Sequence, residues 1–394
     1  MAPPLPRTWL VFLAASTLSQ LGDSVLWFAL GWAAASHGGQ VAALVLTASG
    51  LPRLLLVLVG GSVADRLGAR RLLLCTEAVM VAVCLALAFG LRATGPTPWL
   101  LAAVGLAFGV VSAFSLPALG SMPRRLVDDA ALPHALALRQ GLGQAVLLAG
   151  APLGGVLVAA VGLPAIALAD AACFAAVLVV VAVLRPRREV GAGTERLWRS
   201  LSDGARVVVR TRGLAGALAL TGVVAAAVLP VSALLVPLLG RESGWGAGTT
   251  GLVVAAQAAG SIGVALVVAR TGTARRTGRA VALGLAVAAT GVALVAASGD
   301  GAPALTAGAA AVVGTGTGVA VAHLAPFVLG SAPRTHLARV QAWTALAQLA
   351  PVVVSNNLLG ALAEQASPGV ALSCCAVTLG VCALAAARLR AASS

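Results

Sequence analysis

The chain consists of apolar runs of roughly 20 residues, separated by short breaks that are polar or contain glycine and proline. In helical form, a run of this length spans the hydrocarbon core of a membrane, which is about 30 Å thick. Such runs recur along the whole sequence and predict twelve transmembrane helices in two pseudo-symmetric six-helix bundles. We place these helices near residues 9–35, 41–63, 72–91, 98–119, 138–160, 164–184, 213–239, 249–269, 280–298, 304–329, 339–362 and 369–388.

Composition supports an all-α membrane protein. Of the 394 residues, 60% are hydrophobic and 10% are charged, whereas a soluble domain has about 25% charged residues. Several soluble domains are therefore excluded, and the runs are longer than the strands of a membrane β-barrel. The first run is also longer than the apolar core of a signal peptide. We therefore expect the first helix to be retained as a membrane anchor.

One long polar connector, residues 185–212, divides the chain almost in half. It holds eight of the arginines together with Glu189, Glu195 and Asp203. We therefore predict an N-terminal six-helix bundle over residues 1–184 and a C-terminal six-helix bundle over residues 213–394. The apolar spacing between Leu197 and Val209 is amphipathic and indicates a helix at the membrane surface.

The basic residues predict the orientation of the chain. All 26 are arginine, and the formal net charge is +14. With both termini placed in the cytoplasm, every arginine falls in a cytoplasmic segment except Arg92 and Arg241 in outer loops and Arg53 within a helix. The lack of lysine and the abundance of Ala, Gly and Val suggest a bacterial genome rich in G and C. We therefore expect a bacterial inner-membrane protein and no nucleic-acid partner, since the cations lie in loops instead of on one basic face.

The sequence offers no catalytic or cofactor-binding motif. The six cysteines lie within apolar runs without metal-ligand spacing, and there is no phosphate-binding loop, nucleophile elbow or H-E-x-x-H motif. We therefore expect no cofactor, no metal and no enzymatic activity. Any energy that the protein uses must therefore come from a partner subunit or from an ion gradient, and a proton gradient is the simplest supply.

The most specific motif is the segment Gly61-Ser-Val-Ala-Asp65-Arg66-Leu-Gly68-Ala-Arg70-Arg71, between the second and third predicted helices. Gly61 allows close helix approach, Gly68 permits a sharp turn, and Asp65 can bind an arginine or a helix N-terminus. The segment resembles the signature loop of the major facilitator superfamily at every defined position. This resemblance implies a gating role in alternating access. An ordinary positive-inside loop is the alternative.

A second motif lies in the fifth predicted helix, Gly150-Ala-Pro152-Leu-Gly154-Gly155. It resembles part of the antiporter motif of exporters in this superfamily, although the glycine expected before the proline is Ala151. Residues 114–180 more generally resemble its drug and siderophore exporters. The resemblance implies export by proton antiport. A helix kink with a glycine packing face is the alternative interpretation.

Ionisable side chains within predicted helices are the candidates for coupling. Asp23 lies in the first helix and Arg53 in the second, within reach of one another. Asp23 alone could carry protons, whereas Asp23 bound to Arg53 would form a structural or gating lock, and a water-facing acid is the third alternative. Asp170 is the second candidate, with a hydrogen-bonded acid near the membrane interface as the alternative. We expect Glu77 to pair with loop arginines.

Uncharged polar side chains could line a cavity for an amphipathic substrate, although each could instead form a bond between helices. The candidates are Gln140, Gln144, Gln257, His323, Gln348, Asn356 and Asn357. The resemblance implies a central cavity between the two halves.

Together these observations predict a monomeric secondary transporter that exports a hydrophobic or amphipathic small molecule, in contact with membrane lipid and in exchange for protons. A lipid or lysophospholipid flippase on the same fold is the first alternative. A membrane-embedded enzyme or sensor is the second, because a fold does not determine function.

Overall fold

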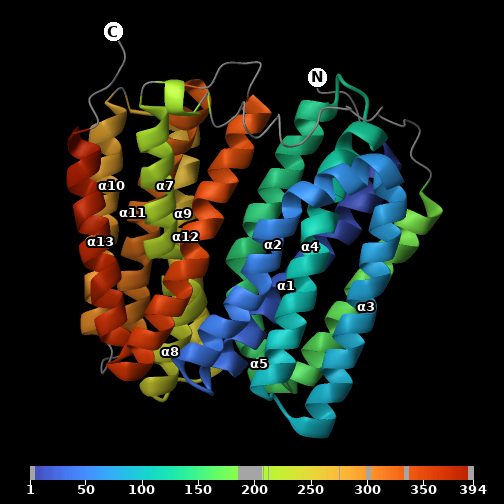
Figure 1. The fold of residues 1–394 in the computed structure, drawn as a ribbon, viewed down its shortest axis with the longest axis horizontal. Coiled ribbons are helices and arrows are strands. Elements are labelled where there is room, and N and C mark those ends of the chain that lie inside the picture. The colour runs from blue at the N-terminus through green and yellow to red at the C-terminus, as the bar shows by residue number, and fades with distance from the viewer. Residues whose placement is uncertain are drawn as a thin grey trace. The chain divides into compact units, whose positions relative to one another are not determined.

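The computed structural model describes residues 5–184, 206, 208–211, 213–274, 276–298, 303–331 and 337–388. Within these ranges the chain is helical and contains no β-strand. Figure 1 shows the helices as long, roughly antiparallel rods. The first half contains α1 (Arg7–Ala35), α2 (Gly39–Leu67), α3 (Ala69–Thr94), α4 (Pro98–Leu126) and α5 (Leu132–Val183).

The second half continues the same pattern. Its first crossing runs from Leu214 to Glu242 and contains a five-residue π-helical segment, η1. Its elements are α7 (Leu214–Pro230), η1 (Val231–Leu235), α8 (Val236–Glu242), α9 (Ala247–Thr271), α10 (Thr277–Ala297), α11 (Pro303–Ser331), α12 (Leu337–Gln365) and α13 (Pro368–Arg388).

The number of membrane crossings agrees with the prediction. Eleven helical segments of the described chain are long and apolar enough to span a bilayer. One of them, α5, has 52 residues and is bent at Gly162, whose φ of 77° and ψ of 167° are not helical. Each arm of α5 is about one membrane thickness long. The predicted all-α fold with twelve crossings is therefore confirmed.

The chain forms two compact units. Unit 1 comprises Met1–Ala34 and Val45–Thr194, and unit 2 comprises Ala35–Leu44 and Glu195–Ser394. The first turns of α2 therefore group with unit 2 by their contacts. The amphipathic helix predicted at 197–209 lies almost entirely outside the described residues.

The packing of the first turns of α2 within unit 2 is close and partly polar. The backbone N–H of Gln40 donates to Oε2 of Glu364 at 2.8 Å. A Cβ on Gly360 would lie 2.6 Å from the backbone oxygen of Gly39. The Glu364 carboxylate thus satisfies a free N–H group in the first turn of α2, where the helix dipole favours negative charge.

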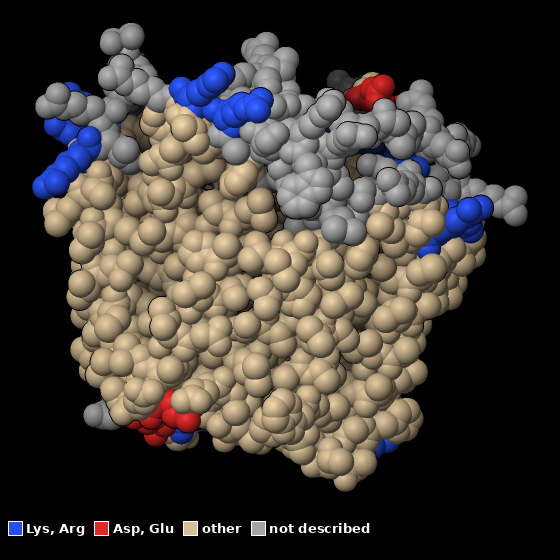
Figure 2. Space-filling model, viewed as in Figure 1, with Lys and Arg blue, Asp and Glu red and all other residues tan. Residues whose placement is uncertain are grey.

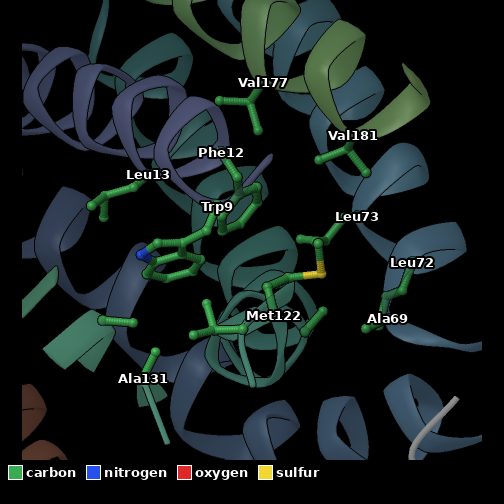
Figure 3. Close-up of a cluster of buried hydrophobic side chains, with 13 residues drawn as sticks. Trp9, Phe12, Leu13, Ala69, Leu72, Leu73, Met122, Ala131, Val177 and Val181 are labelled. Carbon is green, nitrogen blue, oxygen red and sulfur yellow. The ribbon is translucent and has the colours of Figure 1, made fainter. Parts of the chain in front are cut away.

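The core of unit 1 includes a cluster of buried apolar side chains from α1, α3, α4 and α5 (Figure 3). Trp9, Leu73 and Met122 lie at its centre and are fully buried. On the face drawn in Figure 2, the described arginines and acids lie near the helix ends, and the surface over the helix middles shows no charged side chain. This distribution is that expected of helices surrounded by lipid.

Candidate functional site

Three acidic side chains from three helices approach one another inside unit 1. Asp23 belongs to α1, Glu77 to α3, and Asp170 to the second arm of α5. Asp23 interacts electrostatically with both Glu77 and Asp170, and Glu77 interacts with Asp170. Gly22 brings the α1 backbone against Asp170, because a Cβ at Gly22 would collide with Oδ1 of Asp170. We call these three residues the carboxyl cluster.

In the carboxyl cluster Glu77 and Asp170 are buried and Asp23 is half-buried, and none of them has a positive partner among the residues that the structure describes. Glu77 is 4% exposed and Asp170 is 1% exposed. One oxygen of each acid is buried without a hydrogen-bond partner, namely Oδ1 of Asp23, Oε2 of Glu77 and Oδ1 of Asp170. An isolated carboxylate is costly in such surroundings. The cluster can therefore reduce its charge by holding protons.

Two thiols interact with the carboxyl cluster, and aromatic residues lie one helical turn from Asp23 and from Asp170 on the same helices. The fully buried Cys84 on α3 donates to Oδ2 of Asp170 at 3.7 Å. Cys173, one turn from Asp170, also interacts with it. Phe108 of α4 contacts Trp27 of α1 edge-on at a centroid separation of 5.4 Å, and lies 6.3 Å from Phe174 of α5. None of these groups supplies a positive charge.

The expected partners of two of these acids are not beside them. Among the described side chains, no ion pair joins Asp23 to Arg53, and Arg53 is exposed. Glu77 is buried in the cluster and makes no ion pair with the described loop arginines. The described loop arginines are therefore not partners of Glu77, whereas the side chain of Arg66 lies outside the described part. The position of Glu77 relative to α1 and α5 depends on tertiary packing, which hydropathy does not reveal.

The signature segment lies at the junction of α2 and α3. Residues Gly61 to Leu67 continue α2 as a helix, so the chain turns only at Gly68, later than predicted. Gly68 has a φ of +81°, and a Cβ there would meet no atom within 4 Å. Glycine is therefore required at this position for its backbone conformation and not for space. The surroundings of Gly61 and the side chains of Asp65 and Arg66 fall outside the described part.

Arg70 of the signature segment binds the end of α5. Its Nε donates to the backbone oxygens of Val181 at 3.1 Å and Leu184 at 3.0 Å, and its Nη2 donates to that of Ala182 at 2.6 Å. The last carbonyl groups of a helix have no partner within the helix and carry partial negative charge. Arg70 thus caps α5, whereas Arg71 is exposed.

We expect Arg70→Ala to lower the stability of the protein by roughly 2–3 kcal/mol, the value of a charge-assisted hydrogen bond at a helix C-terminus. Thermal unfolding in detergent, followed by size-exclusion chromatography, measures this effect. Arg71→Ala is the matched control and should unfold at the wild-type temperature. Equal unfolding temperatures for the two variants would contradict the capping role of Arg70.

The antiporter-like motif packs on α1 beside the carboxyl cluster. A Cβ at Gly150 would collide with the Ser24 side chain, and one at Gly154 would lie 3.0 Å from the backbone oxygen of Val25. These two glycines therefore allow the first arm of α5 to approach α1 one residue after Asp23. Pro152 lies between these two glycines on the same arm, and Gly155 directly follows Gly154.

The predicted cavity-lining residues differ in exposure. Gln257 and Asn356 are buried, and each has a side-chain oxygen without a partner among the described atoms. The side chains of four others are exposed, namely those of Gln140, Gln144, Gln348 and Asn357. Gln140 and Gln144 are four residues apart on α5 and share one face of that helix. These residues stay candidates for substrate contact.

His323 has a local role that the sequence did not indicate. It is 6% exposed on α11. Its Nε2 accepts a hydrogen bond from the backbone N–H of Ala274 at 3.0 Å, and its Nδ1 lies 2.8 Å from the backbone oxygen of Val319. Since a backbone N–H can only donate and a carbonyl can only accept, the ring is neutral with its hydrogen on Nδ1. His323 thus attaches the turn after α9 to α11.

In the described chain, no group of three His, Cys, Asp or Glu side chains is spaced to hold a metal ion. The carboxyl cluster instead offers carboxyl oxygens, a chemical group that can take up and release protons.

Comparison with known proteins places this arrangement in a family. The sequence profile of the Major Facilitator Superfamily matches residues 12–356. No curated protein sequence matches the chain. Similar solved structures include a point mutant of the nucleoside transporter NupG, with a TM-score of 0.77, 13% identity, and coverage of 96% of this chain and 99% of that one.

Two further similar structures are also transporters. A bacterial homologue of the iron transporter ferroportin in an inward-facing state has a TM-score of 0.73 and 15% identity, covering 98% of this chain and 100% of that one. A POT family transporter in complex with a thioalcohol-conjugated peptide has a TM-score of 0.75 and 12% identity, covering 96% and 95%. Identities this low show the shared fold alone. From the profile match and the fold together, the chain belongs to the Major Facilitator Superfamily and is a multi-pass membrane transporter.

Proposed function

We propose that this transporter exports a hydrophobic or amphipathic small molecule in exchange for protons. The observation that carries the proposal is the carboxyl cluster, in which Glu77 and Asp170 are buried, Asp23 is half-buried, and none of the three has a positive partner among the described residues. Acids at membrane depth are costly, and their presence favours a role in coupling. Of the three roles considered for Asp23, we favour proton carriage, because the described side chains show no ion pair with Arg53 that would form a lock, and the buried Oδ1 argues against a water-facing acid.

The direction of transport is supported by the antiporter-like motif. Gly150 and Gly154 hold the first arm of α5 against α1 next to Asp23. Any movement between these two helices would change the surroundings of Asp23 directly. This link between helix packing and a protonatable group is what an antiporter needs, because substrate and proton must bind in alternation.

The substrate class is supported by the residues available for contact. The described polar candidates are mostly uncharged, including exposed Gln140 and Gln144 on α5 and Gln348 on α12. Such surfaces suit an apolar molecule with few polar groups. The similar structures are of a nucleoside transporter, a POT family transporter in complex with a conjugated peptide, and a bacterial homologue of an iron transporter. The fold therefore does not determine the substrate.

The arginine distribution supports an orientation with both termini in the cytoplasm, because cytoplasmic loops are enriched in basic residues. The composition supports a bacterial inner membrane, and we propose that the protein is a monomer. Asp65 and its neighbours would then face the cytoplasm, where the resemblance implies gating.

The proposal is tested with the wild-type protein and Asp23→Asn in proteoliposomes that contain a pH-sensitive dye. Ethidium and a bisbenzimide DNA stain serve as amphipathic probes, and a pH gradient drives exchange. We expect each transported probe to increase proton flux through the wild-type protein. In Asp23→Asn, the probe-dependent proton flux should fall to that of protein-free liposomes, because the amide cannot release a proton.

Asp129→Asn is the control, since Asp129 is an exposed acid in the turn before α5. It should leave the proton flux unchanged. Unaltered flux in Asp23→Asn would remove Asp23 from the coupling mechanism. No probe-dependent flux in any variant, together with movement of fluorescent lipid between leaflets, would favour the flippase.

A further inference from the structure

We propose that His323 and the turn after α9 form an acid-sensitive switch in unit 2. The hydrogen bond from the backbone N–H of Ala274 to Nε2 of His323 holds the turn against α11, and a second proton on the ring releases it. The switch uses none of the residues on which the proposed antiport depends. Only the side of the membrane on which acid acts rests on the orientation proposed above, which places this turn in the cytoplasm.

Helices α9, α10 and α11 form a close-packed frame around the switch. A Cβ on Gly284 of α10 would lie 2.7 Å from the backbone oxygen of Gly316 of α11. A Cβ on Gly318 of α11 would lie 3.0 Å from the backbone oxygen of Ser261 of α9. The three helices are thus packed backbone to backbone, without room for a larger side chain. We therefore expect the frame to stay in place when the turn between α9 and α10 moves.

The turn itself has few bonds to the frame. Gly272 ends α9 with a φ of 79°, and its N–H donates to the backbone oxygen of Val268 at 2.8 Å. At the other end, the N–H groups of Arg279 and Ala280 donate to the backbone oxygen of Arg276. Among the described residues, no hydrogen bond other than that of Ala274 joins this turn to α11. The position of the turn therefore depends on His323.

The hydrogen bonds of His323 explain why a proton breaks this attachment. Nδ1 carries the single ring hydrogen toward the backbone oxygen of Val319, which leaves the lone pair of Nε2 for Ala274. A second proton, taken from water, adds to this lone pair, so two N–H donors then face each other. The ring is buried, and its charged form needs water. Ala274 is exposed and can bond to water once released. Protonation and release therefore occur together.

The helices that pack against α11 offer no acid that could keep a protonated ring in place. These helices are α7, α9, α10 and α12. The first three contain no Asp or Glu, and neither does α11 itself. The one acid of α12, Glu364, lies in its last turn and binds the N–H of Gln40 instead.

The basic residues near the switch are arginines at the adjoining ends of α9 and α10. The described ones are Arg270, Arg276 and Arg279. The side chains of His336 and Arg339, next to the start of α12, fall outside the described part. A protonated His323 thus adds positive charge to a segment that is already basic, and it has no described carboxylate to bind.

Amide hydrogen exchange of the full-length protein in lipid nanodiscs, followed by mass spectrometry of peptides that contain Ala274, tests the switch without a substrate. Free imidazole titrates between about pH 5 and 8. After correction for the intrinsic pH dependence of exchange, we expect the protection of the Ala274 amide to fall roughly tenfold between about pH 7.5 and about pH 5.5. Peptides from the packed middle of α11, around Gly316, should keep their protection.

Substitutions at position 323 separate the charge of the ring from its hydrogen bond. In His323→Gln, the amide oxygen can accept from Ala274 but does not titrate in this range, so the protection should be equal at both pH values. In His323→Leu, the acceptor is missing, and protection should be about fivefold lower than in the wild type near neutral pH and should not respond to acid. His134→Gln is the control, because His134 is exposed in the first turn of α5, and it should keep the wild-type response.

Two results would overturn the switch. Equal protection of Ala274 in the wild type at both pH values would show that the bond does not respond to acid. A full acid response in His323→Gln, or in His323→Leu where the glutamine variant does not fold, would assign the response to another group. Neither measurement involves transport. If probe-driven proton flux is absent while the acid response of Ala274 is present, the antiport proposal falls and the switch stands.

Discussion

Gly150→Val should destabilise unit 1 by about 1–3 kcal/mol, the usual range for forcing extra methyl groups into a packed interface, and should abolish probe-dependent proton flux. The new Cβ would collide with the side chain of Ser24 on α1. Either α1 or the first arm of α5 must move, and Asp23 precedes Ser24 in α1. The displacement would therefore alter the carboxyl cluster as well as the packing.

The matched control is Gly143→Val, two turns earlier in α5, where a Cβ would meet no atom within 4 Å. This variant should unfold at the wild-type temperature. The double variant Gly150→Val with Ser24→Gly restores space by removing the obstructing side chain, so it should recover most of the stability and flux. Wild-type behaviour of Gly150→Val alone would show that the motif does not hold α5 against α1.

The sequence predicted the helices well because membranes limit the choice of structure. A run of about twenty apolar residues in lipid can satisfy its backbone groups only as a helix, which gave the number and order of the crossings. The ends were less accurate, because hydropathy detects the part of a helix that lies in lipid. The first arm of α5 begins at Leu132, before the predicted start at residue 138, and α2 continues through the charged end of the signature segment.

The candidate site was predicted in part. Asp23 and Asp170 were found because charged residues are conspicuous in apolar runs. Glu77 was not, since its distance from a helix end suggested arginine partners. Its true neighbours are on α1 and on the second arm of α5, far away in sequence. Likewise, the bond from Ala274 to His323 depends on how α9 and α11 pack, which local patterns do not encode.

Gly314→Ala should be among the most damaging small substitutions in unit 2, at about 3 kcal/mol or more. Gly314 of α11 lies directly against α9, and its Cβ would collide with the backbone oxygen of Gln257 and lie 2.7 Å from its carbonyl carbon. The hydroxyl of Ser261, one turn further along α9, donates to the backbone oxygen of Gly314 at 3.0 Å. A single methyl group would therefore separate two helices and weaken their hydrogen bond.

Gly308→Ala on the same helix is the control, because its Cβ would meet no atom within 4 Å. Thermal unfolding should show a large decrease for Gly314→Ala and little change for Gly308→Ala. No substitution at position 257 should rescue Gly314→Ala, because the obstructing atoms belong to the backbone of Gln257 and every residue type has the same backbone. Gly150→Val differs, since the obstacle there is the Ser24 side chain. Recovery of stability in Gly314→Ala with Gln257→Ala would show that the side chain, and not the backbone, limits the approach of α9 to α11.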